Sequence, residues 1–192
     1  AADVKRTASE LDAARLQTLR ARAVLEALDR GRLPTIQQAD DLPAAKIAEL
    51  NAQASAIYQE FRARLARIQA DIEKRQAELQ STQTLVKKLE STLPYAEARA
   101  QDYKQLSEKN FMSRHAWMEK EQIRLEQEGE LANQRSRKTE IVAALREAHE
   151  QRNALITETR RQLMDSGSEG RYKSAVLEQE LVKARSRLQL TQ

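Results

Sequence analysis

The stretch Lys109-Asn110-Phe111-Met112-Ser113 decides the fold. It is a short break between two long helical patterns, one reaching back to about Pro43 and one reaching towards Gln192. A long helix, a tight reversal and a second long helix make a helical hairpin, with this stretch at its tip. Any helical hairpin needs such a turn, so the break by itself predicts a fold and not a function.

The second helix is expected to begin at Ser113. A serine hydroxyl at the N-cap accepts a hydrogen bond from a free backbone N–H of the first turn. Met112 and Trp117 would then hold the two positions of a hydrophobic staple. The sequence therefore predicts a defined tip and not a flexible loop.

The composition argues for long helices and against a globular domain. The chain has only 4 Gly, 3 Pro and 2 Phe, 32% of its residues are charged, and much of its 40% hydrophobic share is alanine. Large apolar side chains are too few for a thick core but sufficient for a narrow seam between helices. We therefore expect a single elongated helical domain, which is a fragment of a larger protein.

The charge balance and the absence of cysteine say little about the compartment or the partners of the protein. The net charge is +4, from 33 basic and 29 acidic residues that are interspersed. Such charges usually form solvated helix faces, and no aromatic stacking set or DNA-reading motif indicates nucleic acid. The lack of cysteine fits an oxidising compartment such as the periplasm, although many cytosolic chains also lack it. No apolar run approaches the roughly 20 residues that span a bilayer.

The first part of the chain predicts a helix and a loop. Residues 3–30 keep an approximate helical spacing of apolar side chains, and Gly31 is the expected stop. Residues 31–43 have the composition of a loop. Asp41 or Leu42 is expected to cap the next helix, with the following proline in its first turn.

The ascending long helix is predicted over residues 44–110. Pro94 lies inside it and is expected to kink it, because proline removes one backbone hydrogen bond. Its apolar seam advances in steps of three, four or seven residues: Ile47, Leu50, Ala54, Ile57, Phe61, Leu65, Ile68, Ile72, Leu79, Val86, Leu89, Leu93, Ala96, Tyr103 and Leu106.

The descending long helix is predicted over residues 114–192, after a tip at 111–113. Gly129 should lower its helix propensity by about 1 kcal/mol relative to alanine. Residues 165–170, rich in Gly and Ser, would break the helix or continue it as a soft hinge, and we favour continuation with high mobility. The expected seam is Trp117, Leu125, Leu131, Val142, Leu145, Leu155, Leu163, Leu177, Leu181 and Leu188.

Helix lengths predict how the three helices pack. At ~1.5 Å per residue the long helices measure ~100 Å and ~118 Å, so they can lie antiparallel from the tip nearly to a common base. We expect the first helix to run antiparallel beside the second. The fold class is therefore all-α: a long antiparallel α-helical hairpin, or coiled coil, with a shorter third helix packed near the base. The outer faces are expected to carry mainly Arg, Glu, Gln and Lys, so the isolated chain should be a monomer or a loose dimer.

Little in the sequence suggests an enzyme. His115 and His149 are the only histidines, 34 residues apart on one predicted helix, and they form no constellation with carboxylates. Glycines are scattered, so no phosphate loop is present, and Asp40 and Asp41 are explained by helix capping. We expect no catalytic residue, no metal and no cofactor.

The tip is the informative region for function. Arg99, Leu106 and Ser113 follow one another at intervals of seven, a spacing that places residues on one helix face. A basic residue, a bulky apolar anchor and a small hydroxyl make a plausible patch for docking helices, and Asp102 lies between them. The candidate partner-binding residues are thus Arg99, Asp102, Leu106 and Ser113.

The tip and its flanks resemble a known family, the haemolysin-D-type periplasmic adaptors or membrane fusion proteins of type I secretion. These adaptors carry a Leu and a Ser seven apart at the hairpin tip, matched here by Leu106 and Ser113. The flanks STLPYAEAR and SRHAWMEKEQIRLEQEGEL, and the opening ADVKRTASELDAARLQTLRARAVLEAL, also read like the family. One departure concerns the basic residue that stands four before the Leu in related adaptors. That position is Asp102 here, and Arg99 and Lys104 are the nearest basic groups.

The resemblance implies a mechanical role in protein export. It implies an adaptor that bridges an inner-membrane ABC transporter, through parts outside this chain, and a TolC-type outer-membrane channel at the tip. It further implies a ring of copies, six in the family, a periplasmic location with an inner-membrane anchor outside this chain, and a toxin or protease as cargo. Two alternatives remain: a coiled-coil scaffold or tether without a transport role, and a basic nucleic-acid binder, which a steep salt dependence of binding would reveal.

Overall fold

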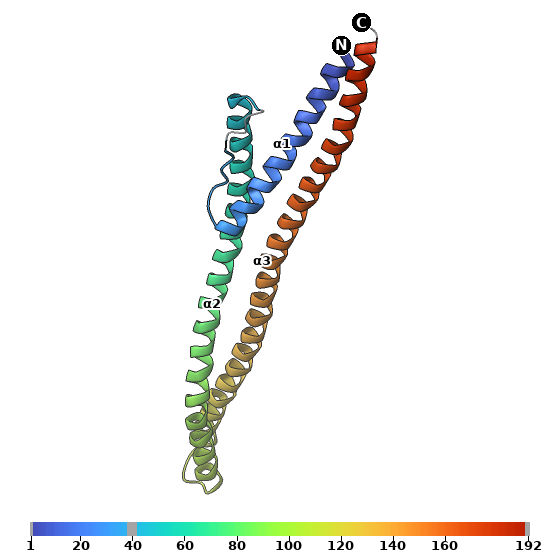
Figure 1. The fold of residues 1–192 in the computed structure, drawn as a ribbon. Helices are drawn as coiled ribbons and strands as arrows, with labels where there is room; N and C mark the ends of the chain where they lie inside the picture. The colour runs from blue at the N-terminus through green and yellow to red at the C-terminus, as the bar shows by residue number, and fades with distance from the viewer. Residues whose placement is uncertain (1, 38–41, 191–192) are drawn as a thin grey trace. The chain divides into compact units, whose positions relative to one another are not determined.

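The chain forms three α-helices. The computed structural model describes residues 2–37 and 42–190, with α1 spanning Ala2–Arg30, α2 spanning Ala44–Glu108 and α3 spanning Arg114–Leu190 (Figure 1). No strand occurs in these described ranges, and none of their helices is long and apolar enough to cross a membrane. The all-α fold class is confirmed.

Contacts between α2 and α3 establish the antiparallel hairpin. The Arg135 guanidinium donates to Glu90 at 2.9 Å, and the Lys120 ammonium lies 5.4 Å from the ring centre of Tyr103. The residue number therefore falls along α3 as it rises along α2. The chain divides into two compact units, a three-helix unit of residues 2–67 and 152–190 and a two-helix unit of residues 68–151.

Local caps explain where the first two helices meet the loop between them. Gly31 adopts a left-handed φ of 67°, and its N–H donates to the Ala27 carbonyl at 2.8 Å, so it ends α1 as expected. The Pro43 carbonyl accepts from the Ile47 N–H at 3.2 Å, which places Pro43 before α2 and not in its first turn, a correction to the expectation. Proline is tolerated there because it lacks only an N–H that the helix would leave unpaired. The proposed cap Asp41, with Asp40, lies outside the described residues.

The three-helix unit has a core that all three helices share. Val24 of α1 and Ala54 of α2 are fully buried and cluster with Leu163 of α3. The returning loop is tied to the same unit, because the Asn51 side chain accepts from the Ile36 N–H at 2.7 Å and donates to its carbonyl at 3.1 Å. The third helix near the base is thus confirmed.

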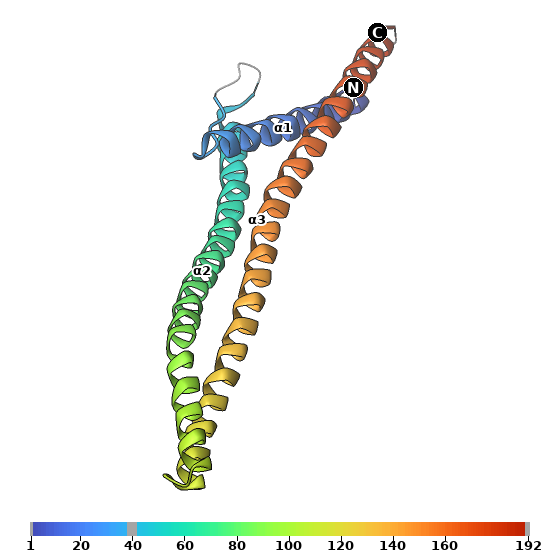
Figure 2. The same ribbon diagram turned by 90° about the horizontal axis from the view of Figure 1, so that it is seen from below.

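The direction of α1 differs from the expectation. Arg15 pairs with Glu178 and Arg160 pairs with Asp29, so α1 runs antiparallel to α3, with its first residues beside the end of α3 (Figures 1 and 2). Within the same unit, Arg20 donates to Gln53 at 3.0 Å and Val24 clusters with Ala54, so α1 and the start of α2 run in the same sense (Figure 1), and the predicted antiparallel pairing of α1 with α2 is wrong. The loop is long enough to carry the chain back, and Asn51 holds it along α2 as it returns.

The two glycines that were expected to make α3 mobile are instead the places where α1 packs closely against it. The helix continues through residues 165–170, and Gly167 and Gly170 are both buried. A Cβ on Gly170 would lie 3.0 Å from the Ala14 carbonyl oxygen and would overlap the Thr18 hydroxyl. The expected lack of packing in this stretch is therefore wrong, because the missing side chains allow two helix backbones to come close.

The two-helix unit shows a different register for α3 from the one expected. Its core joins Val86 and Leu89 of α2 to Leu131 of α3. Leu125 and Val142 are exposed, so their assignment to the seam is wrong. The inward face of α3 instead carries, besides Leu131, the buried or half-buried residues Trp117, Lys120, Arg124, Gln127, Gln134, Lys138, Ile141, Leu145 and Ala148.

The seam of α2 agrees with the sequence pattern, whereas the outer faces do not. Every expected α2 seam residue is buried or half-buried except Leu106, and the helix continues through Pro94. The exposed surface is not limited to charged and amide side chains, because Tyr95, Met118, Leu125 and Met164 are all exposed. Apolar groups therefore remain for contacts with other molecules.

The hairpin tip as a candidate docking site

A Schellman cap ends α2 at the tip. Asn110 adopts a left-handed φ of 59°, which asparagine tolerates better than most residues. Its N–H donates to the Ser107 carbonyl at 3.1 Å, and the Phe111 N–H donates to the Leu106 carbonyl at 2.9 Å. These two bonds define the motif and satisfy carbonyls that the helix end would leave free.

Ser113 caps the start of α3 as the sequence predicts. Its hydroxyl oxygen accepts from the Ala116 N–H at 3.2 Å, and its carbonyl accepts from the Trp117 N–H at 3.4 Å. Met112 and Trp117, the expected staple pair, are both half-buried. The reversal therefore takes only the few residues between the two caps, each with defined hydrogen bonds.

The cap geometry decides which expected site residues share a face. Arg99 and Leu106 lie seven apart on the continuous helix α2, and both are exposed. Ser113 belongs to the start of α3, so the heptad argument that placed it on the same face is wrong, because such spacing holds only within one helix. Asp102 is exposed on α2, one turn from Leu106.

Phe111 is a candidate site residue that the sequence analysis did not single out. Its side chain is 78% exposed, compared with 38% for Leu106, although both are large and apolar. The Schellman motif places the two residues at its C″ and C3 positions, where a hydrophobic contact is common. An aromatic side chain directly after the helix-ending asparagine, with no place in either helical seam, was the available signal.

The surroundings of these apolar side chains are mainly cationic. Lys109 and Arg114 are exposed at the reversal beside one carboxylate, Glu108, and His115 is also exposed; one turn back on α2, Lys104 and Asp102 are both exposed. The tip therefore presents an apolar end with a basic surround. Such a surface suits a partner with an apolar recess and carboxylates at its edge.

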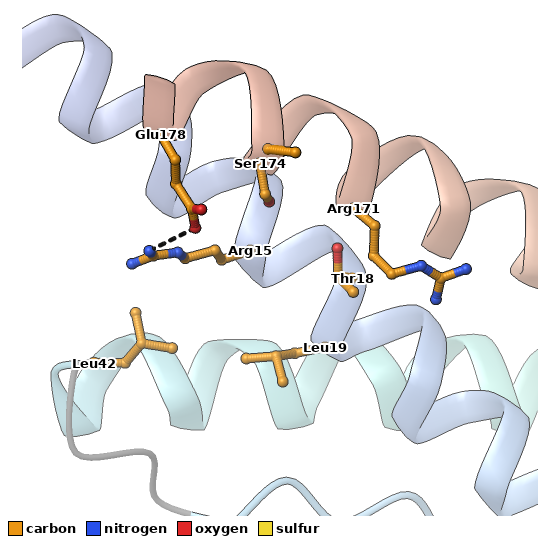
Figure 3. Close-up of a pocket in the computed structure, with 8 residues that line it drawn as sticks. Arg15, Thr18, Leu19, Leu42, Arg171, Ser174 and Glu178 are labelled. Atoms are coloured by element: carbon orange, nitrogen blue, oxygen red, sulfur yellow. Dashed lines mark hydrogen bonds and ion pairs between the residues drawn. The ribbon is translucent and has the colours of Figure 1, made fainter. Parts of the chain in front are cut away.

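Elsewhere in the described residues, no group of three or more His, Cys, Asp or Glu side chains is placed to hold a metal ion. One pocket in the three-helix unit lies between α1, α3 and Leu42, just before α2 (Figure 3). Arg15 pairs there with Glu178 at 3.0 Å, above the apolar side chains Leu19 and Leu42.

The hydroxyls that line this pocket are occupied within their own helices. Thr18 donates to the Ala14 carbonyl at 3.1 Å and Ser174 donates to the Gly170 carbonyl at 2.8 Å. The carboxylate of this pocket, Glu178, pairs with Arg15, and the structure records no hydrogen bond from either hydroxyl to a base among the described residues. The tip remains the stronger candidate site.

Known proteins share both the sequence and the fold. The family described as the CyaD alpha-helical hairpin domain matches residues 1–191. Two proteins named Protein CyaD, from the Tohama I and 18323 strains of Bordetella pertussis, are each 32% identical over 183 residues. The match covers 93% of this chain and 34% of each relative, so the chain spans about a third of the length of these relatives.

A solved structure has the same fold. It is the soluble domain of LipC, described as a membrane fusion protein of a type I secretion system. The TM-score is 0.71 at 16% identity, over 97% of this chain and 92% of that chain. The resemblance to secretion adaptors is thereby confirmed at the level of the family: the chain belongs to the CyaD α-helical hairpin domain family.

Proposed function

We propose that this hairpin is the docking arm of a secretion adaptor and that its tip binds a TolC-type outer-membrane channel. One observation carries the proposal: Leu106 and Phe111 are exposed at an end of the hairpin that hydrogen-bonded caps hold in place. Large apolar side chains at a rigid end bind with little loss of conformational freedom, because the end is already ordered. Family membership and the fold shared with the LipC soluble domain support an adaptor role.

The remaining parts of the proposal follow from the same family. The adaptor would contact an inner-membrane ABC transporter through segments outside this hairpin and would lie in the periplasm, anchored to the inner membrane by such a segment. Several copies, six by resemblance, would surround the export path of a protein such as a toxin or protease. The transporter would supply the energy, and the hairpin would act mechanically without a cofactor.

The competing function is a coiled-coil scaffold or tether without a transport role. A tether also needs helical seams, but it has no need for apolar side chains exposed at a capped reversal. The two functions therefore differ in what a change at Leu106 does.

Replacement of Leu106 by Asp in the full-length adaptor tests the proposal. A carboxylate at this position should abolish export, because it cannot enter an apolar recess without losing its hydration. Helix content should not change, since the side chain is already 38% exposed. Secreted cargo and the circular dichroism of the purified protein are the two readouts.

Met164→Asp is the matched control, because Met164 is an exposed apolar residue of α3 far along the chain from the tip. Export should continue in this variant. Normal export by Leu106→Asp would overturn the docking role, and equal loss in both variants would show that the tip is not special.

A further inference from the structure

The two-helix unit has apolar side chains on the faces that point away from its own seam. On α2, Tyr95 is 73% exposed, and Ser91 and Ala98 lie on the same helix face. On α3, Met118 and Leu125 are 50% and 54% exposed. With ~3.6 residues per turn, each of these faces lies roughly opposite the residues that join α2 to α3.

Gly129 lies in the middle of the α3 outer face, between Leu125 and Ala132 at steps of four and three. A Cβ at this position would have no atom within 4 Å, so nothing in the described residues requires a glycine there. Gly170 on the same helix differs, because α1 approaches it closely. A glycine in a helix interior costs about 1 kcal/mol relative to alanine, and close approach by another molecule would explain it.

The heights of the two outer faces match. Glu90 pairs with Arg135, and Tyr103 contacts Lys120, so these two contacts fix the antiparallel register of the unit. Interpolation between them at an equal rise per residue places Tyr95 level with Gly129. The bulky exposed side chain of Tyr95 on one side of the hairpin thus lies at the same height as Gly129, which has no side chain, on the other side.

The charges beside these faces are complementary. The same interpolation places Arg99 level with Glu126. Arg99 is exposed and makes no ion pair among the described residues. Glu126 is also exposed, and its one hydrogen bond within the described part of the chain comes from the Gln122 side chain at 2.9 Å. When two antiparallel helices pack together, the residues that flank the contact on one side of one helix meet the residues that flank it on the same side of the other. Arg99 of α2 and Glu126 of α3 flank such a contact on the same side.

We propose that the occupant of each outer face is a second copy of this chain, oriented in the same direction and at the same height. The α2 face of one copy packs on the α3 face of the next, with Tyr95 seated over Gly129 and Arg99 beside Glu126. Because the two faces differ, the contact is heterologous and repeats from copy to copy, as in a ring. The inference rests on the proposed function, since it names the surface through which adaptor copies meet, and it assigns Arg99 to that surface in place of the tip.

Cysteine cross-linking in the full-length adaptor tests the contact directly, because the 192-residue chain has no cysteine of its own. The variant with Tyr95→Cys and Gly129→Cys should give a ladder of disulfide-linked multimers under mild oxidation in cells. Each single variant should give none, because a heterologous contact does not place a residue against its own copy. A disulfide needs Cα atoms within about 7 Å, which residues on opposite sides of one hairpin do not approach.

Tyr95→Cys with Ala143→Cys is the control for height, because Ala143 is exposed but ~21 Å further along α3 than Gly129. It should not cross-link. Absence of the ladder in the first pair, a product limited to dimers, or equal cross-linking in the control would overturn the inference. If the ladder fails while Leu106→Asp still abolishes export, the lateral contact alone is wrong. If the ladder forms while Leu106→Asp exports normally, the tip function alone is wrong.

Discussion

The two units of this chain differ in which residues of α3 are buried. In the three-helix unit, α1 covers α3 and buries its glycines, and Val24 and Ala54 lose all contact with water. In the two-helix unit, the inward face of α3 carries Lys120 and Arg124, while apolar Leu125 is exposed. In the first unit the glycines of α3 are covered within one chain, whereas in the second unit Gly129 and the apolar Leu125 beside it remain open to other molecules.

The largest expected effect comes from the seam of the two-helix unit. Ile72 is 1% exposed, so Ile72→Ala should lower the free energy of unfolding by about 2–5 kcal/mol through lost burial and a cavity. Leu125→Ala should change it by less than about 0.5 kcal/mol, because this leucine faces outward. Urea unfolding of the purified chain, followed by circular dichroism, measures both. A loss at Leu125 as large as that at Ile72 would show that the α3 seam does run through Leu125.

The sequence predicted some features of the fold and not others. Caps are local, so the pattern around Gly31, Asn110 and Ser113 was enough to place the ends of the helices. The register of α3 was not predictable in the same way. Its apolar residues are sparse near the tip, and a seam through Leu125 differs by only one position from the observed seam through Arg124.

Features that depend on distant parts of the chain escaped prediction for a physical reason. The burial of Gly170 depends on α1, more than 150 residues earlier in the sequence, and glycine alone signals only weak helix propensity. The direction of α1 depends on how the loop returns along Asn51. At the tip, Leu106 was identified by its place in the seam, but Phe111 has no periodic position and emerged only from the geometry of the cap.

The two mid-helix glycines should respond in opposite directions to the same substitution. Gly170→Ala should destabilise the chain by about 1–3 kcal/mol, because the new methyl group meets the Ala14 carbonyl at 3.0 Å and the Thr18 hydroxyl. Gly129→Ala should stabilise it by about 0.5–1 kcal/mol, because the methyl group enters open space and the helix propensity rises. Thermal unfolding of the two variants beside the parent chain gives both values.

Equal stabilisation by both alanines would contradict the close approach of α1 to α3. Residues 165–170 would then be a mobile hinge in α3, whereas the contacts of Gly170 indicate close packing.

The smallest expected effect concerns an ion pair in the two-helix unit. The hydrogen bond from Arg124 lowers the pKa of the Glu121 carboxyl below its ordinary 4.5. A carboxyl with a lowered pKa in the folded state stabilises the fold above its unfolded pKa, and this contribution is lost as the pH falls through the folded value. Glu121→Gln should therefore be slightly less stable than the parent at pH 7, with the difference disappearing below pH 4.5.

Unfolding measured at several pH values tests this sign. A difference between the two chains that grew on acidification would contradict it. Added salt should reduce the difference at pH 7, because the pair is only half-buried and dissolved ions still screen it.

The central claim is that the capped tip docks on the export channel through Leu106 and Phe111. Site-specific photo-cross-linking tests it most directly, with a photoreactive amino acid at position 106, 111 or 164 of the full-length adaptor during export. The account predicts cross-links to the outer-membrane channel from positions 106 and 111 and none from position 164. Channel cross-links from position 164 with none from positions 106 and 111 would contradict it.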